Sequence, residues 1–172
     1  MTELRRPELL DPRRHHRSAF ASGEPELDDW LHRYSTQNRR RNTAATWVVT
    51  RDDLHVVGYV SIAMTGVDRS QAPAELARQA PDPVPGLLIG RLAVDRSVAG
   101  LGLGTALVAH VLATAVDLNE RVACRAVVVN ALTARARTWW ERFGFHPFDA
   151  GDPDNLDLYL LTGEVRATLA SM

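Results

Sequence analysis

Apolar and polar positions recur along the chain with two periods, one typical of helices and one typical of strands. Residues 23–41 carry apolar side chains at helical spacing, which predicts an amphipathic helix with Ser22 as its candidate N-cap. The next two apolar runs, residues 45–50 and 55–64, are β-branched and aromatic. Because only the polar residues 51–54 separate them, we expect these two runs to form a hairpin of two strands.

The rest of the chain alternates strands and helices after an irregular insertion. Residues 70–86 hold four of the nine prolines, which predicts an irregular insertion with one short helix. The predicted elements that follow are a strand at 87–94, a helix after the glycines at 100–104, a strand at 124–131, a helix at 133–144 and a strand at 156–161. This order predicts a single α/β domain over residues 1–172, with a mixed, mostly antiparallel central sheet flanked by helices.

Length and composition restrict the class of protein further. A chain of 172 residues with 45% apolar content can bury one substantial core. No apolar run approaches the roughly 18 residues of a membrane span, and the first ten residues lack the apolar centre of a signal peptide, so we expect a cytoplasmic protein without membrane contact. The histidines and the single cysteine never fall at a metal-ligand spacing, which predicts no metal. Cys124 lies in an apolar run, which favours a buried thiol over a nucleophile.

Charge is distributed unevenly although the formal net charge is only -1. Residues 1–51 carry ten arginines against seven acidic residues, whereas residues 52–172 carry ten against fourteen. All 20 basic residues are arginine, a side chain suited to bidentate contact with phosphate. A compositional bias is the alternative explanation for the absence of lysine.

Three glycines occupy alternate positions directly before a helical apolar run, at Gly100, Gly102 and Gly104. A strand that enters a glycine-rich turn and then a helix directs free backbone N–H groups and the positive helix end at one point, which favours an anion, usually a phosphate. The chain lacks the Gly-Lys-Ser/Thr of a nucleotide-binding P-loop and the acidic residue of a dinucleotide fold. The alternative is a tight helix entry packed on the sheet.

The glycine-rich stretch VAGLGLGTALV resembles the coenzyme A loop of the GNAT superfamily of N-acetyltransferases, with Ala99 where glutamine or arginine is usual. Over most of the chain, FASGEPELDDWL, VVGYVSIAM, GRLAVDRSVAGLGLGTAL, VVVNALTARARTWWERFGFHP and LDLYLL are similar to the acetyltransferase toxins of toxin-antitoxin pairs. Members of that family acetylate the free amine of aminoacyl-tRNA and are neutralised by a ribbon-helix-helix antitoxin. The resemblance implies the GNAT fold, acetyl-CoA as cofactor, aminoacyl-tRNA as substrate, such an antitoxin as partner, and a block of translation.

The resemblance also implies where the cofactor binds. Backbone groups of one strand end receive the pantetheine arm, and these belong to Leu92, Ala93 and Val94. Amides of the following loop hold the pyrophosphate, with Thr105 at the start of the supporting helix, and these belong to Ala99, Gly100, Leu101, Gly102, Leu103 and Gly104. Transfer is then a direct attack of a neutral amine on the thioester, with a backbone N–H near Val94 meeting the oxyanion.

Two candidate catalytic positions follow from the same resemblance. Asn130 lies at a strand end and either faces the acyl group or caps the next helix. Trp140 stands where the family has a tyrosine that protonates the departing thiolate, but an indole N–H is no acid near neutral pH. Trp140 is therefore either beside the thioester sulfur or a core residue, and Tyr59 and Tyr159 are the candidate replacements for the missing acid.

Seven arginines are candidates for contact with tRNA phosphates, and the alternative is that they lie on solvated faces and complement helix dipoles. They are Arg33, Arg39, Arg40, Arg41, Arg135, Arg137 and Arg142. Two other functions remain open, an N-acetyltransferase of a small amine or a protein N-terminus and a catalytically impaired coenzyme A-binding protein that acts through a partner. The sequence leaves homodimer formation open.

Overall fold

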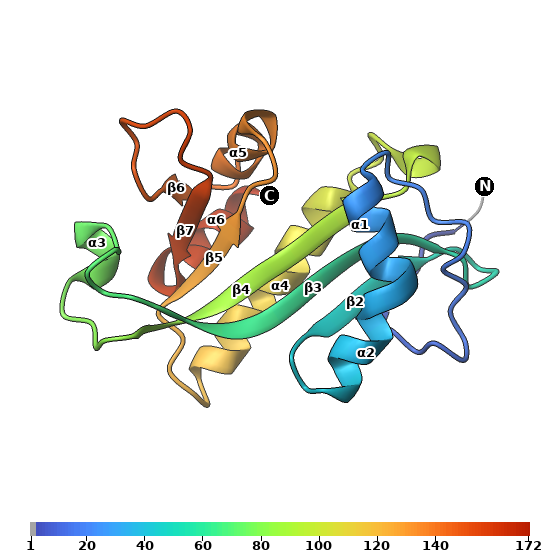
Figure 1. Cartoon of the computed structure of the whole chain (residues 1–172), viewed down its shortest axis with the longest axis horizontal. Helices are drawn as coiled ribbons and strands as arrows, with labels where there is room; N and C mark the ends of the chain where they lie inside the picture. Colours follow the sequence, from blue (N-terminus) through green and yellow to red (C-terminus); the bar gives the residue numbers. More distant parts are fainter. Residues whose placement is uncertain (1–2) are drawn as a thin grey trace. The chain divides into compact units, whose positions relative to one another are not determined.

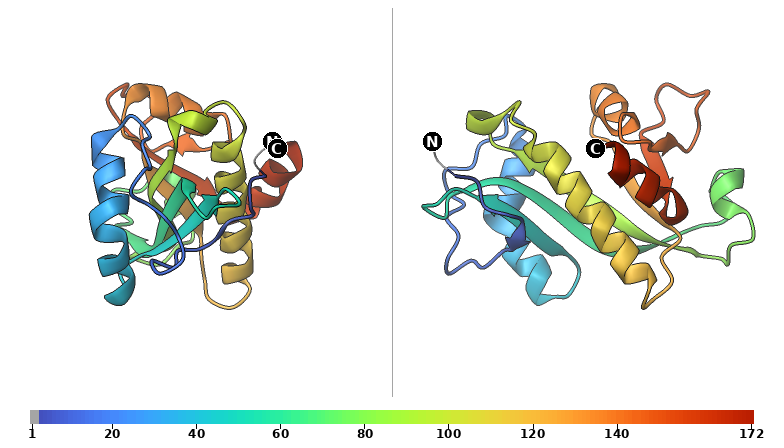
Figure 2. Two further views of the ribbon diagram at one scale, coloured as in Figure 1. Left: turned by 90° about the vertical axis from the view of Figure 1, so that its right-hand side faces the viewer. Right: turned by 180° about the vertical axis from the view of Figure 1, so that it is seen from behind.

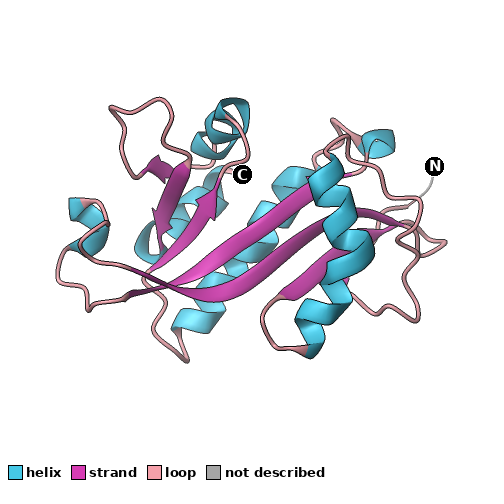
Figure 3. Ribbon diagram, viewed as in Figure 1, coloured by secondary structure: helices cyan, strands magenta, loops and turns pink. Residues whose placement is uncertain are grey.

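The computed structural model describes residues 3–172. The chain forms two compact units. The first unit contains the chain up to Ala63 together with Gly90–His110, and the second contains Met64–Ile89 and Val111–Met172. Three long elements contribute residues to both units, and they are β3 (Val56–Val67), β4 (Val84–Val94) and α4 (Leu103–Asn119). The strands form one seven-stranded sheet in the order β1-β2-β3-β4-β5-β7-β6 (Figure 1, Figure 3). The predicted α/β class is confirmed.

The first unit begins with a short edge strand and a continuous helical stretch. Its further elements are β1 (Glu8–Leu9), α1 (Pro25–Asp29), the π-helical turn η1 (Trp30–Tyr34), α2 (Ser35–Arg40), β2 (Ala45–Thr50) and the 3₁₀ turn η2 (Arg96–Val98). Strand β2 pairs antiparallel with both β1 and β3, so the predicted hairpin is confirmed. The predicted amphipathic helix is confirmed as the run from α1 to α2.

The predicted cap of this helical stretch was wrong by two positions. Glu24 holds the N-cap position and Pro25 begins the helix, since the fixed φ of proline suits the first helical turn and its missing N–H is no loss there. The Ser22 hydroxyl instead donates to Asp28 Oδ1 at 2.6 Å and accepts from the Glu24 N–H at 3.1 Å. Ser22 therefore braces the loop before the helix.

The core of the first unit lies between the helical stretch and the sheet. Trp30 stacks on Tyr59 with ring centroids 5.7 Å apart, and Phe20 meets the same ring edge-on at 5.6 Å. On the other face, a Cβ at Gly58 would touch the side chains of Leu103 and Leu107 at 3.4 Å. The start of α4 therefore covers the face of β3 opposite to α1, as the side and back views show (Figure 2).

The second unit contains the parallel part of the sheet. Its further elements are α3 (Ala74–Ala77), β5 (Ala126–Asn130), α5 (Ala134–Glu141), β6 (His146–Pro147), β7 (Asp157–Leu161), the 3₁₀ turn η3 (Thr162–Glu164) and α6 (Val165–Ser171). Strand β5 pairs parallel with β4 and antiparallel with β7, which pairs antiparallel with β6. Leu76 of α3 packs with Val84, Val128 and Tyr159 in one apolar cluster.

Strand β4 starts three residues earlier than predicted, at Val84. Pro85 and Gly86 suggest a turn in the sequence, yet Gly86 pairs with Ala126 of β5. A Cβ at Gly86 would lie 3.1 Å from the Ala126 carbonyl oxygen. Glycine is needed here because two strands approach each other closely. Gly86 was predicted to belong to an irregular insertion, but it lies inside a strand.

Three expectations from the sequence concern residues that the structure describes. Cys124 is 1% exposed just before β5, as predicted for a buried thiol, and burial raises the pKa of that thiol. Within residues 3–172, none of the helices combines the length and apolar character that a membrane crossing requires. This part of the chain also brings no three His, Cys, Asp or Glu side chains together as metal ligands.

Candidate functional site

The glycine-rich loop adopts backbone conformations that only glycine reaches without strain. Gly100 has φ +79 and Gly102 has φ +83, both in the left-handed region. A Cβ added at either position would meet nothing within 4 Å. The loop therefore borders open space on the side of these two positions. The start of α4 does pack beside Gly58 of β3, through Leu103 and Leu107, so the tight helix entry stays an alternative to an anion site.

Helix α4 starts directly after this loop, at Leu103. Gly104 and Thr105 lie in its first turn, which contains no acidic residue, and the first helical N–H groups have no partners within a helix. The Gly102 carbonyl accepts the N–H of Ala106 at 3.0 Å and so closes the first turn. The positive end of a helix of 17 residues therefore begins where the two left-handed glycines leave space.

A carboxylate that the sequence analysis missed holds the loop in place. Asp95 Oδ1 accepts from the Ser97 N–H at 2.8 Å and the Ser97 hydroxyl at 2.6 Å, and Oδ2 accepts from the Ala21 N–H at 2.8 Å. Arg51 adds a bond to the Ser97 hydroxyl at 2.6 Å. Burial by itself would raise the pKa of Asp95, but these hydrogen bonds outweigh burial and leave the pKa below its ordinary value. The Asp-x-Ser spacing after a strand is the signal that could have found it.

The end of β4 carries the residues predicted to receive a pantetheine arm. Pairing of β4 with β5 runs from Gly86 to Ile89, whereas β4 continues to Val94. Leu92 and Val94 are half-buried and Ala93 between them is buried. The structure therefore brings Leu92, Ala93 and Val94 into the same unit as the loop at 99–105.

These features fit a ligand with a pyrophosphate group. The left-handed glycines leave open the position that a side chain would fill, and the first turn of α4 supplies N–H donors and a positive end. Coenzyme A combines such a pyrophosphate with a long arm that bonds to a strand backbone, so the chain has the groups that would hold it.

Asn130 ends β5 in the second unit and is exposed. Its side-chain Nδ2 donates to Asp157 Oδ1 at 2.7 Å, and the two residues face each other across β5 and β7. The next helix is capped by Thr133, whose hydroxyl accepts the Ala136 N–H at 3.1 Å. The capping role considered for Asn130 was therefore wrong, while its role near the acyl group stays a prediction.

Trp140 lies in α5 and is 5% exposed. Its ring meets three aromatic rings edge-on, with centroid distances of 4.9 Å to Trp139, 5.3 Å to Phe145 and 6.5 Å to Phe143. Trp140 is therefore part of an aromatic cluster in the second unit, as a core residue would be.

The two tyrosines considered as replacement acids have other bonds. The Tyr59 hydroxyl donates to the Leu27 carbonyl at 2.7 Å, and burial raises its pKa well above the ordinary value. The Tyr159 hydroxyl donates to Glu75 Oε2 at 2.9 Å, and burial together with this carboxylate raises its pKa to about 12. Each hydroxyl already donates a hydrogen bond to a structural acceptor and is a weaker acid than free tyrosine, which disfavours both as replacements for the missing acid.

Four of the seven candidate arginines lie in the first unit. Arg33 Nε pairs with Asp29 Oδ1 at 2.7 Å along the helix. Arg39, Arg40 and Arg41 are exposed at the end of α2 and in the following turn, and none of the three has an ion pair within residues 3–172. The exposed run of three is therefore available to an anionic partner.

The other three candidates lie in the second unit. Arg137 Nη1 donates to the carbonyls of Asp152 and Asn155, each at 2.7 Å, and its Nε pairs with Glu141 Oε1 at 2.9 Å. Its side chain is only 12% exposed, so it braces the loop before β7. Arg135 and Arg142 are exposed.

Comparison with known proteins places the chain in a family. The acetyltransferase (GNAT) family matches residues 9–145. A tRNA-acetylating toxin of Mycobacterium tuberculosis is 36% identical over 152 residues, which cover 88% of this chain and 89% of the relative.

Solved structures show the same fold. A structure of AtaT complexed with acetyl-methionyl-tRNAfMet superposes with a TM-score of 0.85 at 24% identity, covering 96% of this chain and 98% of that one. A structure of an AtaT mutant toxin bound to the C-terminus of the antitoxin AtaR and acetyl-CoA superposes with a TM-score of 0.80 at 24% identity, covering 96% and 97%. With a family match over most of its length and a relative aligned over most of both proteins, this chain belongs to the acetyltransferase (GNAT) family.

Proposed function

We propose that this chain is an acetyl-CoA-dependent N-acetyltransferase that acetylates the free amine of aminoacyl-tRNA and thereby blocks translation as a toxin. The observation that carries the proposal is the open loop of left-handed glycines at the start of α4, which supports a coenzyme A site. The identity with the mycobacterial toxin supports aminoacyl-tRNA as the acceptor. Arginines without carboxylate partners at the end of α2 are consistent with an acceptor rich in phosphates.

The backbone provides most of the proposed cofactor site. The amides of residues 99–105 hold the pyrophosphate, and the backbone of Leu92, Ala93 and Val94 binds the pantetheine arm. Acetyl-CoA supplies an acetyl group already activated as a thioester. Asp95 and Arg51 keep the loop in position through Ser97, so the donors need little reorganisation when the ligand binds.

Two side chains of the second unit have proposed roles in the transfer. Because Asn130 donates its amide N–H to Asp157, its carbonyl oxygen is left to accept a hydrogen bond from an amine. An amide oxygen orients an amine without deprotonating it, so the acceptor reacts as the neutral amine. Trp140 has no proton that it releases near neutral pH, so we propose that this position gives no acid catalysis to the departing sulfur.

We also propose that both units form one acetyltransferase domain, since the family match includes residues of each. By analogy with the antitoxin complex of AtaT, we propose an antitoxin partner for this chain, of the ribbon-helix-helix type that the sequence resemblance implies. A location in the cytoplasm remains our expectation, and homodimer formation stays open.

The proposal is tested by incubating the purified chain with acetyl-CoA and three acceptors: aminoacyl-tRNA, simple amines and short peptides with a free N-terminus. Mass spectrometry of nuclease-digested tRNA detects N-acetyl-aminoacyl-adenosine, which we expect from the parent protein. The matched control is Gly102→Glu, which blocks the pyrophosphate position. If the amines or peptides are acetylated and aminoacyl-tRNA is not, the proposed acceptor is wrong. If the protein binds acetyl-CoA but transfers the acetyl group to none of the acceptors, it is a catalytically impaired protein.

A further inference from the structure

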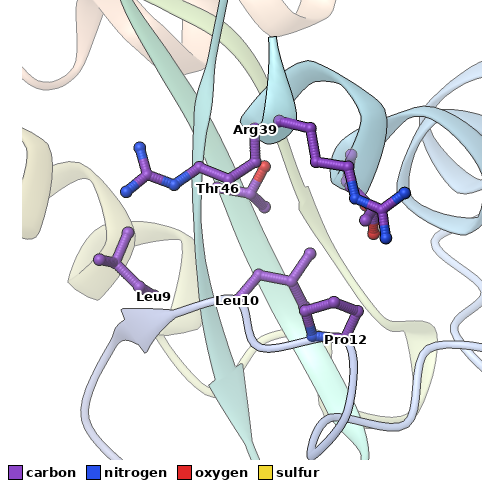
Figure 4. Close-up of a pocket in the computed structure, with 8 residues that line it drawn as sticks. Leu9, Leu10, Pro12, Arg39 and Thr46 are labelled. Atoms are coloured by element: carbon purple, nitrogen blue, oxygen red, sulfur yellow. The ribbon is translucent and has the colours of Figure 1, made fainter. Parts of the chain in front are cut away.

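A pocket of about 200 Å³ lies in the first unit, and none of its lining residues belongs to the glycine-rich loop. One wall is apolar and comes from the N-terminal segment, through Leu9, Leu10 and Pro12. The opposite side comes from α2 and β2, where Arg39 and Thr46 are labelled in the close-up (Figure 4). The pocket is thus apolar on one side and polar on the other.

The apolar wall is held rigidly by backbone and buried polar contacts. The Leu10 N–H donates to the Thr46 carbonyl at 2.9 Å, which fastens the segment beside β2. His15 is 3% exposed, and its Nδ1 accepts the Asp11 N–H at 2.9 Å. That bond leaves a proton on Nε2 for Glu8 Oε1, also at 2.9 Å. The wall therefore exists before any ligand binds.

The polar side carries positive charge that the protein leaves uncompensated. Arg39 and Arg40 line the pocket, and within residues 3–172 neither side chain makes an ion pair or a hydrogen bond. Glu8, the acidic residue of β1, is already paired with His15 at 2.9 Å and Arg14 at 3.5 Å. Two guanidinium groups at a concave site without carboxylates favour an anionic ligand, and arginine geometry suits phosphate.

A buried hydroxyl at the pocket lacks the partner that buried polar groups normally have. Thr46 is 2% exposed, lines the pocket, and its Oγ1 makes no hydrogen bond. Thr36 also lines the pocket, and its hydroxyl oxygen accepts from Arg17 Nη1 at 3.0 Å. The Thr36 proton therefore remains available for a ligand. A solvated helix end explains the arginines alone, but it does not explain why a residue that lines the same pocket keeps a buried hydroxyl without a partner.

We propose that this pocket binds one unpaired nucleotide of an RNA strand, with the phosphate on Arg40 and a base edge at Thr46. The base lies on the apolar wall. A base has a flat apolar face and a hydrogen-bonding edge, so it satisfies both sides of the pocket. An aliphatic peptide side chain would cover the wall and leave Thr46 unpaired, and a base within a duplex could not enter. The proposal rests on the proposed function only for the source of the strand, an unpaired part of tRNA.

The first test measures binding of cytidine 5′-monophosphate by NMR titration, with cytidine and inorganic phosphate as separate ligands. We expect Arg40→Gln to weaken binding about tenfold and Thr46→Val about fivefold, from the loss of one charged and one neutral hydrogen bond. Arg41→Gln is the matched control, because Arg41 is an exposed neighbour that does not line the pocket, and it should leave binding unchanged. Thr46→Val should melt at the parent temperature or above, since it removes an unpaired hydroxyl.

Three results would overturn the inference: an equal loss in Arg41→Gln, no loss in Thr46→Val, or inorganic phosphate binding as tightly as the nucleotide. A second test compares fluorescent single-stranded RNA, duplex RNA and an acidic leucine-rich peptide. Preference for the single strand, weakened in Arg40→Gln and Thr46→Val, supports the inference, whereas preference for the peptide or the duplex overturns it. Neither test requires acetyl transfer. A protein that acetylates aminoacyl-tRNA but does not bind the nucleotide in this pocket refutes only the inference. A protein that binds the nucleotide but does not acetylate aminoacyl-tRNA refutes only the proposed function.

Discussion

Replacing Trp140 by tyrosine tests the position where this chain departs from the family pattern. Trp140 is 5% exposed and meets Phe145 and Trp139 edge-on at 5.3 Å and 4.9 Å. Tyrosine is smaller and brings a hydroxyl into this aromatic cluster. The void and the added polar group together should lower the free energy of unfolding by about 1 to 3 kcal/mol. For a chain of this length, that loss lowers the melting temperature by about 2 to 12 °C.

The expected effect on catalysis follows from the same packing. A hydroxyl beside the thioester sulfur would raise kcat by up to about 10² to 10⁴-fold, with a smaller change in KM, because acid catalysis acts in the transition state. Since the structure places Trp140 among aromatic rings, we expect no increase in kcat. The matched control is Trp140→Phe, which leaves a similar void without the hydroxyl.

Steady-state kinetics on aminoacyl-tRNA and thermal melts of the parent and both variants decide between the two roles. We expect both variants to melt at lower temperature and to share one kcat. A Trp140→Tyr protein at least about tenfold faster than Trp140→Phe would refute the reasoning and would assign the position to acid catalysis.

Four further outcomes are expected. Gly102→Glu should abolish acetyl-CoA binding by calorimetry while Gly102→Ala, which shares the strain of a left-handed φ, retains it; equal affinities in both would remove the loop from the cofactor site. Asp95→Asn should lower the free energy of unfolding by about 1 kcal/mol at pH 7. Because folding lowers the pKa of Asp95 from 3.8, the difference in denaturant unfolding should shrink below about pH 4, and a difference independent of pH would contradict the ionised role. Arg137→Ala should lower the free energy of unfolding by about 1 to 3 kcal/mol, because two hydrogen bonds to carbonyls are lost, and a thermal melt measures this loss. An unchanged melting temperature would contradict the structural role of Arg137. Replacing Arg39 and Arg40 by glutamine should reduce the slope of log binding constant for tRNA against log salt concentration by about one to two units, without changing acetyl-CoA affinity. An unaltered slope would show that both arginines are solvated and do not contact tRNA.

Regular elements with strong periodicity were predictable because their signal is local. The helical run from Pro25 to Arg40 and strands β2 and β7 appear close to their predicted bounds. Short elements such as β1, β6 and α6 escaped prediction, since two to seven residues are too few to display a period. The start of β4 escaped because Pro85 and Gly86 resemble a turn until their strand neighbour is known.

The candidate site also has features that the local sequence predicts and features that depend on the tertiary structure. By itself the sequence determined the glycine loop, since a left-handed φ at Gly100 and Gly102 is a property of the residue type and its immediate neighbours. Only the tertiary structure decided which polar side chains remain free. The Tyr159 hydroxyl bonds to Glu75, which lies 84 positions away in the chain. Thr46 lies across a pocket from Leu9, Leu10 and Pro12, and its hydroxyl gains no partner. Hydrogen bonding between segments so far apart depends on where the backbone brings them, and no local pattern records it.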